Sequence, residues 1–113
     1  MAAHITIRPA DGDWVIRAGG AVIGESGRAL ELQEGDYPPV IYFPRADVAM
    51  EFLERSVTTS TCPHKGMASY YSIVEQNGTI RDAIWTYEQP LPAVAEIAGY
   101  LAFYPGKVEV EQV

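Results

Sequence analysis

Asn77-Gly78 stands between two β-prone runs, Ala68–Gln76 and Thr79–Tyr87, and it constrains the fold more than any other part of the 113-residue chain. Asn-Gly is the strongest short signal for a β-hairpin, because both central residues of a type I′ turn need positive φ. The sequence therefore predicts a long antiparallel hairpin, with its turn at Asn77 and Gly78.

This turn also predicts which residues of the hairpin share a face. With Gln76 opposite Thr79, the cross-strand pairs on the more polar face are Val74–Arg81, Ser72–Ala83 and Tyr70–Trp85. The pairs on the other face are Glu75–Ile80, Ile73–Asp82 and Tyr71–Ile84. The second face is assigned to the core because Tyr71, Ile73, Ile80 and Ile84 lie on it. A one-residue bulge would reverse this assignment.

Further β-prone runs lie on both sides of the long hairpin. Gly19-Gly20 joins two of them in a second hairpin signal, because glycine takes positive φ at little cost. The other β-prone runs are His4–Arg8, Trp14–Arg17, Ala21–Glu25, Ala29–Gln33, Val40–Phe43, Val57–Thr61 and Lys107–Val110, and Tyr100–Tyr104 is either a buried strand or an extended segment. Short helices are predicted at Arg45–Arg55, after Pro44, and at Ala93–Ala98, before Gly99. The chain is thus expected to be one mainly β, antiparallel domain, α+β at the margin, of about eight strands and two short helices.

The charge and the cysteine count narrow the class of protein. A formal net charge of −7 argues against sequence-independent nucleic-acid binding, which needs clustered Lys and Arg, and against an anionic membrane surface. No apolar run approaches the roughly 18 residues of a membrane helix, and the N-terminus lacks a signal-peptide pattern. The single Cys permits no internal disulfide. We therefore expect a cytoplasmic protein with neither nucleic acid nor membrane as partner.

The stretch Thr61–Tyr71 (TCPHKGMASYY) holds the greatest concentration of reactive side-chain types. Cys62 and His64 resemble half of a Rieske cluster loop, but the chain has no second copy. A structural zinc needs four ligands, of which these residues supply two, so no metal and no other cofactor is predicted. A thiolate at Cys62, beside His64 and Lys65, is one alternative, and a packed, inert thiol is the other. The catalytic residues stay unassigned, with Cys62 and His64 as the candidates.

The same stretch also suggests ligand binding. Lys65 and Gly66 in a tight loop present backbone N–H groups and one ammonium to a phosphate or carboxylate. Arg81 adds a second cation if the predicted register holds. Tyr70 and Trp85 form an amphipathic wall, since both combine a flat apolar face with a hydrogen-bond donor. The alternative for each of these residues is solvation or burial in the core.

These residues belong to longer segments that resemble the family catalogued as domain of unknown function 427, which also carries a nucleotidyltransferase-like label. The segments are SGRALEL (Ser26–Leu32), PPVIYFPRADV (Pro38–Val48), TTSTCPHKGMASYYS (Thr58–Ser72) and AIWTYEQPLPAVAEIAGYLAFYPGKVEV (Ala83–Val110). The resemblance covers nearly the whole chain.

The resemblance implies a small β-tent-like domain, in which two sheets meet along one edge and a ligand or zinc site lies between them. The chain lacks the paired CxxC knuckles of zinc-bearing relatives. The family's Cys-Pro-x-Lys-Gly loop corresponds to Cys62, Pro63, Lys65 and Gly66, its aromatic pair to Tyr70 and Tyr71, and its Trp-x-Tyr to Trp85 and Tyr87. No activity comes with the resemblance.

The leading hypothesis is a domain that binds a small anionic or planar ligand at the Cys62–Gly66 loop and the Tyr70/Trp85 hairpin face. The candidate ligand-binding residues are Cys62, His64, Lys65, Gly66, Tyr70, Ser72, Arg81 and Trp85. The alternative is a non-catalytic structural or protein-interaction module without a ligand site, such as a homodimer built on a sheet edge. The leading hypothesis leaves open whether the chain is an enzyme.

Overall fold

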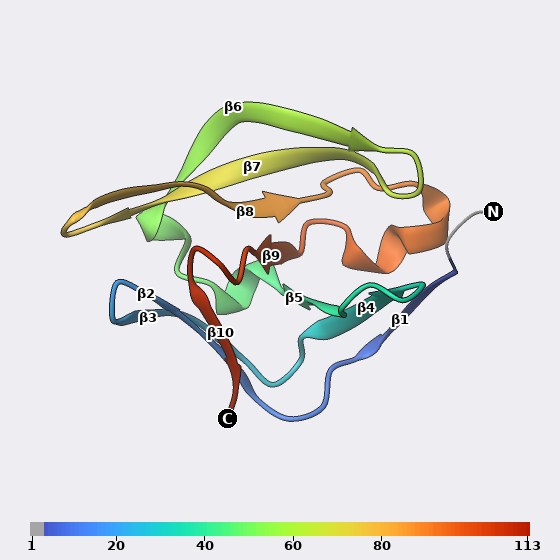
Figure 1. The fold of residues 1–113 in the computed structure, drawn as a ribbon, viewed down its shortest axis with the longest axis horizontal. Helices are drawn as coiled ribbons and strands as arrows, with labels where there is room; N and C mark the ends of the chain where they lie inside the picture. The colour runs from blue at the N-terminus through green and yellow to red at the C-terminus, as the bar shows by residue number, and fades with distance from the viewer. Residues whose placement is uncertain (1–3) are drawn as a thin grey trace.

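The computed structural model describes residues 4–113, which form ten strands in two antiparallel sheets (Figure 1). The larger sheet has the order β1-β4-β5-β9-β8-β7-β6, and the smaller has the order β10-β2-β3. The strands are β1 (Ile5–Pro9), β2 (Trp14–Ala18), β3 (Ala21–Ser26), β4 (Leu30–Glu34), β5 (Val40–Phe43), β6 (Leu53–Cys62), β7 (Gly66–Glu75), β8 (Gly78–Thr86), β9 (Leu101–Phe103) and β10 (Glu109–Gln112). The prediction of a mainly β fold of two antiparallel sheets is confirmed.

The larger sheet is strongly bent, so that its two ends face each other. In Figure 1, β6, β7 and β8 form an upper layer, β1 and β4 lie in the lower layer, and β9 runs between them. The smaller sheet lies beside the lower layer, and a bridge between Gly24 and Val48 joins it to the chain after β5. The final strand, predicted at Lys107–Val110, is β10 (Glu109–Gln112), and it pairs with β2 in the smaller sheet.

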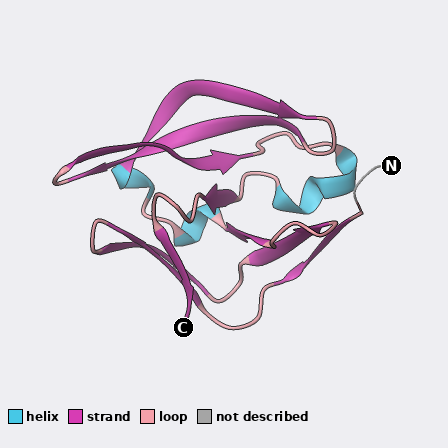
Figure 2. Cartoon of the chain, viewed as in Figure 1, coloured by secondary structure: helices cyan, strands magenta, loops and turns pink. Residues whose placement is uncertain are grey.

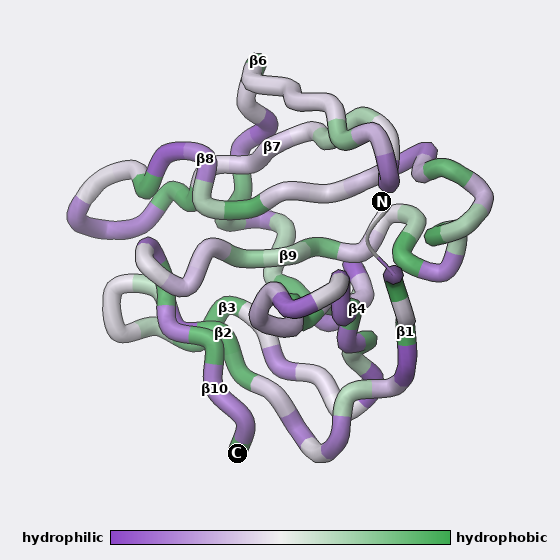
Figure 3. The backbone as a smooth tube through the Cα atoms, turned by 45° about the vertical axis from the view of Figure 1, so that its right-hand side comes forward, coloured by the Kyte–Doolittle hydropathy of each residue, from purple (hydrophilic) through white to green (hydrophobic). Residues whose placement is uncertain are grey.

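The apolar residues form one cluster on each face of the larger sheet. Alternation along β5 separates them, because neighbouring strand residues point to opposite faces. Phe43 belongs to the cluster that also contains residues of the smaller sheet, and Tyr42 belongs to the cluster inside the bend. Figure 3 shows stretches of hydrophobic residues along β9 and along β2 and β3. Strand β9 contributes to both clusters, with Leu101 and Phe103 on one side and Ala102 on the other.

The long hairpin forms, with part of its predicted register. Tyr70 pairs with Trp85 and Tyr71 with Ile84, as expected. Nearer the turn the register differs by two residues, since Glu75 pairs with Gly78, Val74 with Thr79 and Ile73 with Ile80. The core face holds nonetheless: Tyr71, Ile73 and Ile84 are buried, and Ile80 packs against them.

Two local features explain the shift. The turn consists of Gln76 and Asn77, and Gly78 (φ 131°) carries the positive φ where a type I′ turn would need two such residues. Between Tyr71 and Ile73, β8 then bulges at Asp82, whose φ is 48°. The Asp82 N–H donates to Ser72 Oγ at 3.0 Å, so the side chain of Ser72 supports this bulge.

The predicted Arg45–Arg55 helix is wrong. The structure has two 3₁₀ turns, η1 (Arg45–Asp47) and η2 (Met50–Phe52), and then enters β6 at Leu53. Val48 between them is extended (φ −118°, ψ 139°) because its backbone bridges to Gly24. The helix was predicted from apolar residues at i,i+4 spacing, such as Val48 and Phe52, and pairing with the smaller sheet outweighs that pattern. The second predicted helix is a 3₁₀ segment, η3 (Pro92–Ile97), with a non-helical residue at Val94.

Figure 2 shows these three turns as the helical parts of the fold. Within residues 4–113, no helix is long and apolar enough to cross a membrane.

Candidate functional site

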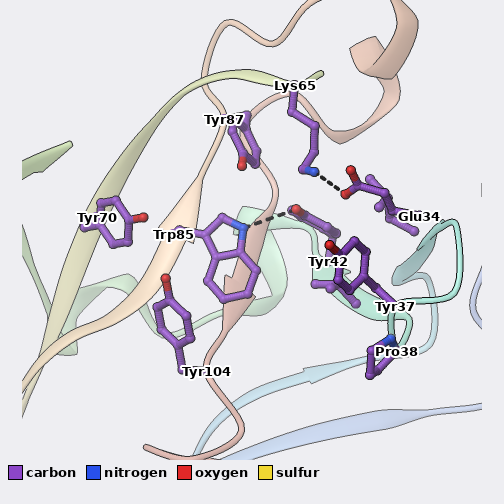
Figure 4. A pocket seen from close by; sticks show the side chains of 11 residues that line it. Glu34, Tyr37, Pro38, Tyr42, Lys65, Tyr70, Trp85, Tyr87 and Tyr104 are labelled. Carbon is purple, nitrogen blue, oxygen red and sulfur yellow. Dashed lines mark hydrogen bonds and ion pairs between the residues drawn. The ribbon is translucent and has the colours of Figure 1, made fainter. Parts of the chain in front are cut away.

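A cavity of about 220 Å³ lies inside the bend of the larger sheet, between the β4–β5 segment and the β7–β8 hairpin (Figure 4). We call it the aromatic pocket. It is lined by Leu32, Glu34, Tyr37, Pro38, Val40, Tyr42, Lys65, Tyr70, Trp85, Tyr87 and Tyr104. Five of the chain's seven tyrosines and one of its two tryptophans are in this lining. Aromatic walls with a few polar groups are typical of small-molecule sites.

Trp85 is held in place at the centre of this lining. Its Nε1–H donates to the Tyr42 hydroxyl at 3.2 Å. The two rings meet edge to face, with centroids 6.3 Å apart and planes at 86°. On the other side the Tyr104 ring lies tilted against the indole, at a centroid distance of 4.5 Å. These contacts leave a fixed, half-buried indole that faces the cavity.

An ion pair forms the polar end of the pocket. Lys65 Nζ lies 2.6 Å from Glu34 Oε1, and the two side chains are only 11% and 18% exposed. Glu34 ends β4, whereas Lys65 lies in the turn between β6 and β7. The ion pair therefore links the two sides of the bend directly across the pocket (Figure 4).

The backbone around Gly66 determines where Lys65 points. The Leu91 N–H donates to the Lys65 carbonyl at 2.9 Å, which holds the turn against the chain that leads to η3. Gly66 follows with a φ of 110°, which favours glycine. A Cβ at this position would also lie 3.5 Å from the Leu91 nitrogen. Backbone geometry thus accounts for the glycine after Lys65, and the Lys65 N–H donates to the Cys62 carbonyl at 3.3 Å within the turn.

Three hydroxyls of the pocket, those of Tyr42, Tyr87 and Tyr104, are neutral donors at ordinary pH. Burial raises the pKa of Tyr42 to about 12, and it also raises the pKa of Tyr87. Burial, followed by the neighbouring Tyr70, raises the pKa of Tyr104 to about 12. The hydroxyl of Tyr70 is hydrogen-bonded to Ser60 Oγ at 2.8 Å. Tyr42, Tyr87 and Tyr104 therefore keep their protons, and their hydroxyls can donate to a ligand.

The structure brings three of the sequence-derived candidates together in this pocket: Lys65, Tyr70 and Trp85. The other five lie outside its lining. Cys62 is half-buried and packs with the cluster inside the bend, and His64 is half-buried in the neighbouring turn. Gly66 acts through the backbone, as described above. Ser72 supports the bulge, and Arg81 is exposed, with its carbonyl accepting from Lys107 Nζ at 2.7 Å.

The sequence analysis missed the opposite wall of the pocket. This wall contains Glu34, Tyr37, Pro38, Tyr42 and Tyr104, and none of them was among the candidate residues. The run Glu34–Pro39 is polar and proline-rich, which resembles a loop, and nothing local shows that it faces Lys65. Gln33 shapes this loop by donating from its amide to the carbonyls of Gly35 and Tyr37.

A second polar cluster lies on the surface around Tyr71. Arg45 and Arg55 both approach its hydroxyl, with donor distances of 3.3 and 3.5 Å, and both guanidinium groups lie over its ring. Glu88 accepts two hydrogen bonds from Arg55, at 2.9 and 3.0 Å, and Arg55 holds the Glu88 pKa below its ordinary value. Since Glu88 already occupies the position that an anion would take, this cluster fastens the start of β6 to the hairpin.

No group of three or more His, Cys, Asp or Glu side chains suited to a metal ion is found within residues 4–113. Two comparisons with known proteins complete the description. A family model described as domain of unknown function (DUF427) matches residues 6–113. The search of curated proteins found no match.

Proposed function

This chain belongs to the family described as domain of unknown function 427 (DUF427), and we propose that its aromatic pocket binds a small planar molecule whose edge carries both a hydrogen-bond donor and an acceptor. The observation that carries this proposal is the Lys65–Glu34 ion pair at the end of an aromatic cavity. An amide or lactam edge matches that pair.

The aromatic lining favours a flat ligand. Trp85 presents its indole to the cavity in a fixed orientation, and the surrounding rings line the same space. Flat rings pack well against such surfaces by offset or edge-to-face contact. The surrounding hydroxyls of Tyr87 and Tyr104 supply further donors at the margin of the ligand.

The ion pair favours a neutral ligand over an anion or a cation. Lys65 uses one N–H on Glu34 Oε1, so the ammonium keeps two N–H donors and the carboxylate keeps its other oxygen. The carbonyl of an amide edge accepts from the Lys65 ammonium, and its N–H donates to the remaining oxygen of the Glu34 carboxylate. A bound anion would meet the Glu34 carboxylate, and the formal net charge of −7 would also disfavour it. A bound cation would meet the Lys65 ammonium.

Three ligands of similar size test this proposal: benzamide, benzoate and benzylammonium. Benzamide is expected to bind most tightly, by about threefold or more over either ion, because only its edge satisfies both members of the ion pair. Titrations followed by heteronuclear NMR at constant ionic strength measure the three dissociation constants.

The variants for the same titration are chosen to keep the fold. Lys65→Met combined with Glu34→Gln removes both charges, and should erase the preference for benzamide. Arg17→Met, which breaks an exposed ion pair on β2, is the control and should leave the order unchanged. If the double variant and Trp85→Ala both bind benzamide as tightly as the unaltered protein does, the aromatic pocket is not the binding site.

Strand β6 favours a second candidate, a homodimer formed by its free edge. It is an edge strand of ten residues, and Ser56–Cys62 contains neither a charge nor a proline. Val57 is 100% exposed. Charges, prolines and bulges are the usual protection of such edges. Strand β6 is irregular between Arg55 and Thr59, but Thr59–Cys62 is regularly paired and has none of these devices, so this end of the strand is suited to pair with a second copy of itself.

Light scattering over a concentration series tests this second candidate. The dimer is expected to dissociate in Val57→Lys, which places like charges near each other across the two-fold axis. Val74→Lys, on the interior strand β7 and 43% exposed, is the matched control and should leave the mass unchanged. A monomer at every concentration of the unaltered protein would rule out the dimer.

A further inference from the structure

A second cavity, of about 250 Å³, adjoins the aromatic pocket, and the two share Val40 and Trp85. We call it the apolar chamber. Its lining includes Trp14, Ile41, Phe103 and Val110, so it lies between the smaller sheet and the β5–β9 pair. Trp85 therefore faces the aromatic pocket with one part of its side chain and the apolar chamber with another.

The chamber opens because the β5–β9 ladder is very short. The two strands pair at only two positions, Tyr42 with Ala102 and Phe43 with Leu101. The next opposed residues, Ile41 with Phe103 and Val40 with Tyr104, are outside the ladder, and Pro39 and Pro105 beyond them have no backbone N–H with which to resume it. The Tyr104 N–H instead donates to the carbonyl of Ala83 at 2.9 Å, on the other neighbour of β9. The strands thus separate beyond Tyr42, and Val40 on β5 lines both cavities, which otherwise lie on opposite faces of the larger sheet.

The chamber is suited to an apolar group. Trp14 Nε1–H already donates to the Asp11 carbonyl at 2.9 Å, which leaves the ring as its contribution to the lining. Glu31 is the one charged residue among the lining residues, and Arg8 neutralises it at 2.7 Å. An apolar group bound here would be removed from water, and the ion pair between Glu31 and Arg8 would stay intact.

We propose that the aromatic pocket and the apolar chamber form one binding site, which takes a planar ring with an amide-like edge and an apolar substituent on the opposite side of that ring. This inference rests on the proposed function of the aromatic pocket. The ring edge meets Lys65 and Glu34, and the substituent passes Val40 and Trp85 into the chamber. Neither cavity alone reaches the roughly 300 Å³ at which small-molecule sites usually begin, whereas the joined cavity does.

A series of para-alkyl benzamides, from methyl to butyl, tests the joined site. Each added methylene is expected to tighten binding about two- to fourfold, because it is transferred from water into an apolar space. The Trp14 indole N–H resonance reports the apolar chamber alone, whereas the Trp85 resonance responds to a ligand in either cavity. Benzamide should shift the Trp85 resonance, and the butyl compound should shift the resonances of both Trp85 and Trp14.

One variant fills the chamber while leaving the polar end of the pocket intact. Val110→Phe, on the edge strand β10, should abolish the gain from the alkyl chain and leave benzamide binding unchanged. Val22→Phe, at a position 47% exposed on β3, is the matched control and should keep the gain.

The outcomes separate the two proposals. An alkyl gain that Val110→Phe removes supports the joined site. Benzamide binding without any alkyl gain, or with a gain that Val110→Phe leaves intact, overturns the joined site and spares the aromatic pocket. If para-butyl benzamide binds equally well when Lys65→Met and Glu34→Gln are combined, the compound lies in the chamber alone. That result also overturns the joined site. Absence of binding by every member contradicts both proposals.

Discussion

Lys65→Met is expected to lower the free energy of unfolding by about 2–4 kcal/mol, because it leaves the Glu34 carboxylate without its partner in a mostly buried site. Lys65 Nζ and Glu34 Oε1 are 2.6 Å apart, and neither side chain is more than 18% exposed. Glu34→Gln should cost a similar amount, since it strands the ammonium. The double variant should lose about 1–3 kcal/mol less than the two single losses together suggest, because no charge is left unpaired.

Urea denaturation of the four proteins measures this coupling. A value of about 1–3 kcal/mol is expected for the Lys65–Glu34 pair. The exposed Arg17–Glu111 pair, with side chains 40% and 47% exposed, is the matched control. Its coupling should stay below about 1 kcal/mol, as for other solvated ion pairs. Equal couplings for the two pairs would show that Lys65 and Glu34 are both solvated, and would remove the polar end of the proposed site.

Phe43→Ala should lower the free energy of unfolding by about 3–5 kcal/mol, the usual cost of emptying a core position of this size. Phe43 is fully buried, and its ring packs edge to face on Phe103, with centroids 5.6 Å apart. It also lies on β5 at one of the two residue pairs that join β5 to β9. The loss therefore affects the junction between the lower layer and the hairpin.

Phe52→Ala is the matched control for this substitution. The predicted Arg45–Arg55 helix would have placed Phe52 on the buried stripe with Val48. In the structure Phe52 is 47% exposed in η2. Its replacement should cost about 1 kcal/mol or less, as for other surface positions. A cost as large as that of Phe43→Ala would contradict the two separate 3₁₀ turns and restore the helix. Chemical denaturation measures both values.

The hairpin shows how far local sequence can predict the fold. The Tyr70–Trp85 pair was predicted correctly, although the predicted turn was one residue too late. The shift at the turn and the bulge at Asp82 offset each other, so the register beyond the bulge is the expected one. Nothing in the local pattern indicates the bulge, because it depends on the hydrogen bond from Asp82 to Ser72. The same residues still face the core, because the shift at the turn and the bulge each change the pairing by two residues, which leaves every side chain on its predicted face.

The pocket shows where local sequence stops being informative. Lys65 and Trp85 were identified because they lie on the hairpin or in the adjacent turn. Their partners Glu34 and Tyr42 come from β4 and β5, which reach the hairpin only through the bend of the larger sheet. Contacts between residues so far apart in the sequence are determined by the order of the strands in the sheet. The sequence predicts individual strands, and it does not predict the order β5-β9-β8.

The central claim is that a planar molecule with an amide edge lies between Trp85 and the Lys65–Glu34 pair. Intermolecular nuclear Overhauser effects from benzamide test it most directly. The account predicts contacts from the benzamide ring protons to the rings of Trp85 and Tyr87, and to the Lys65 side chain, with the amide edge nearest Glu34. Contacts confined to residues outside the aromatic pocket, or none under saturating benzamide, would contradict it.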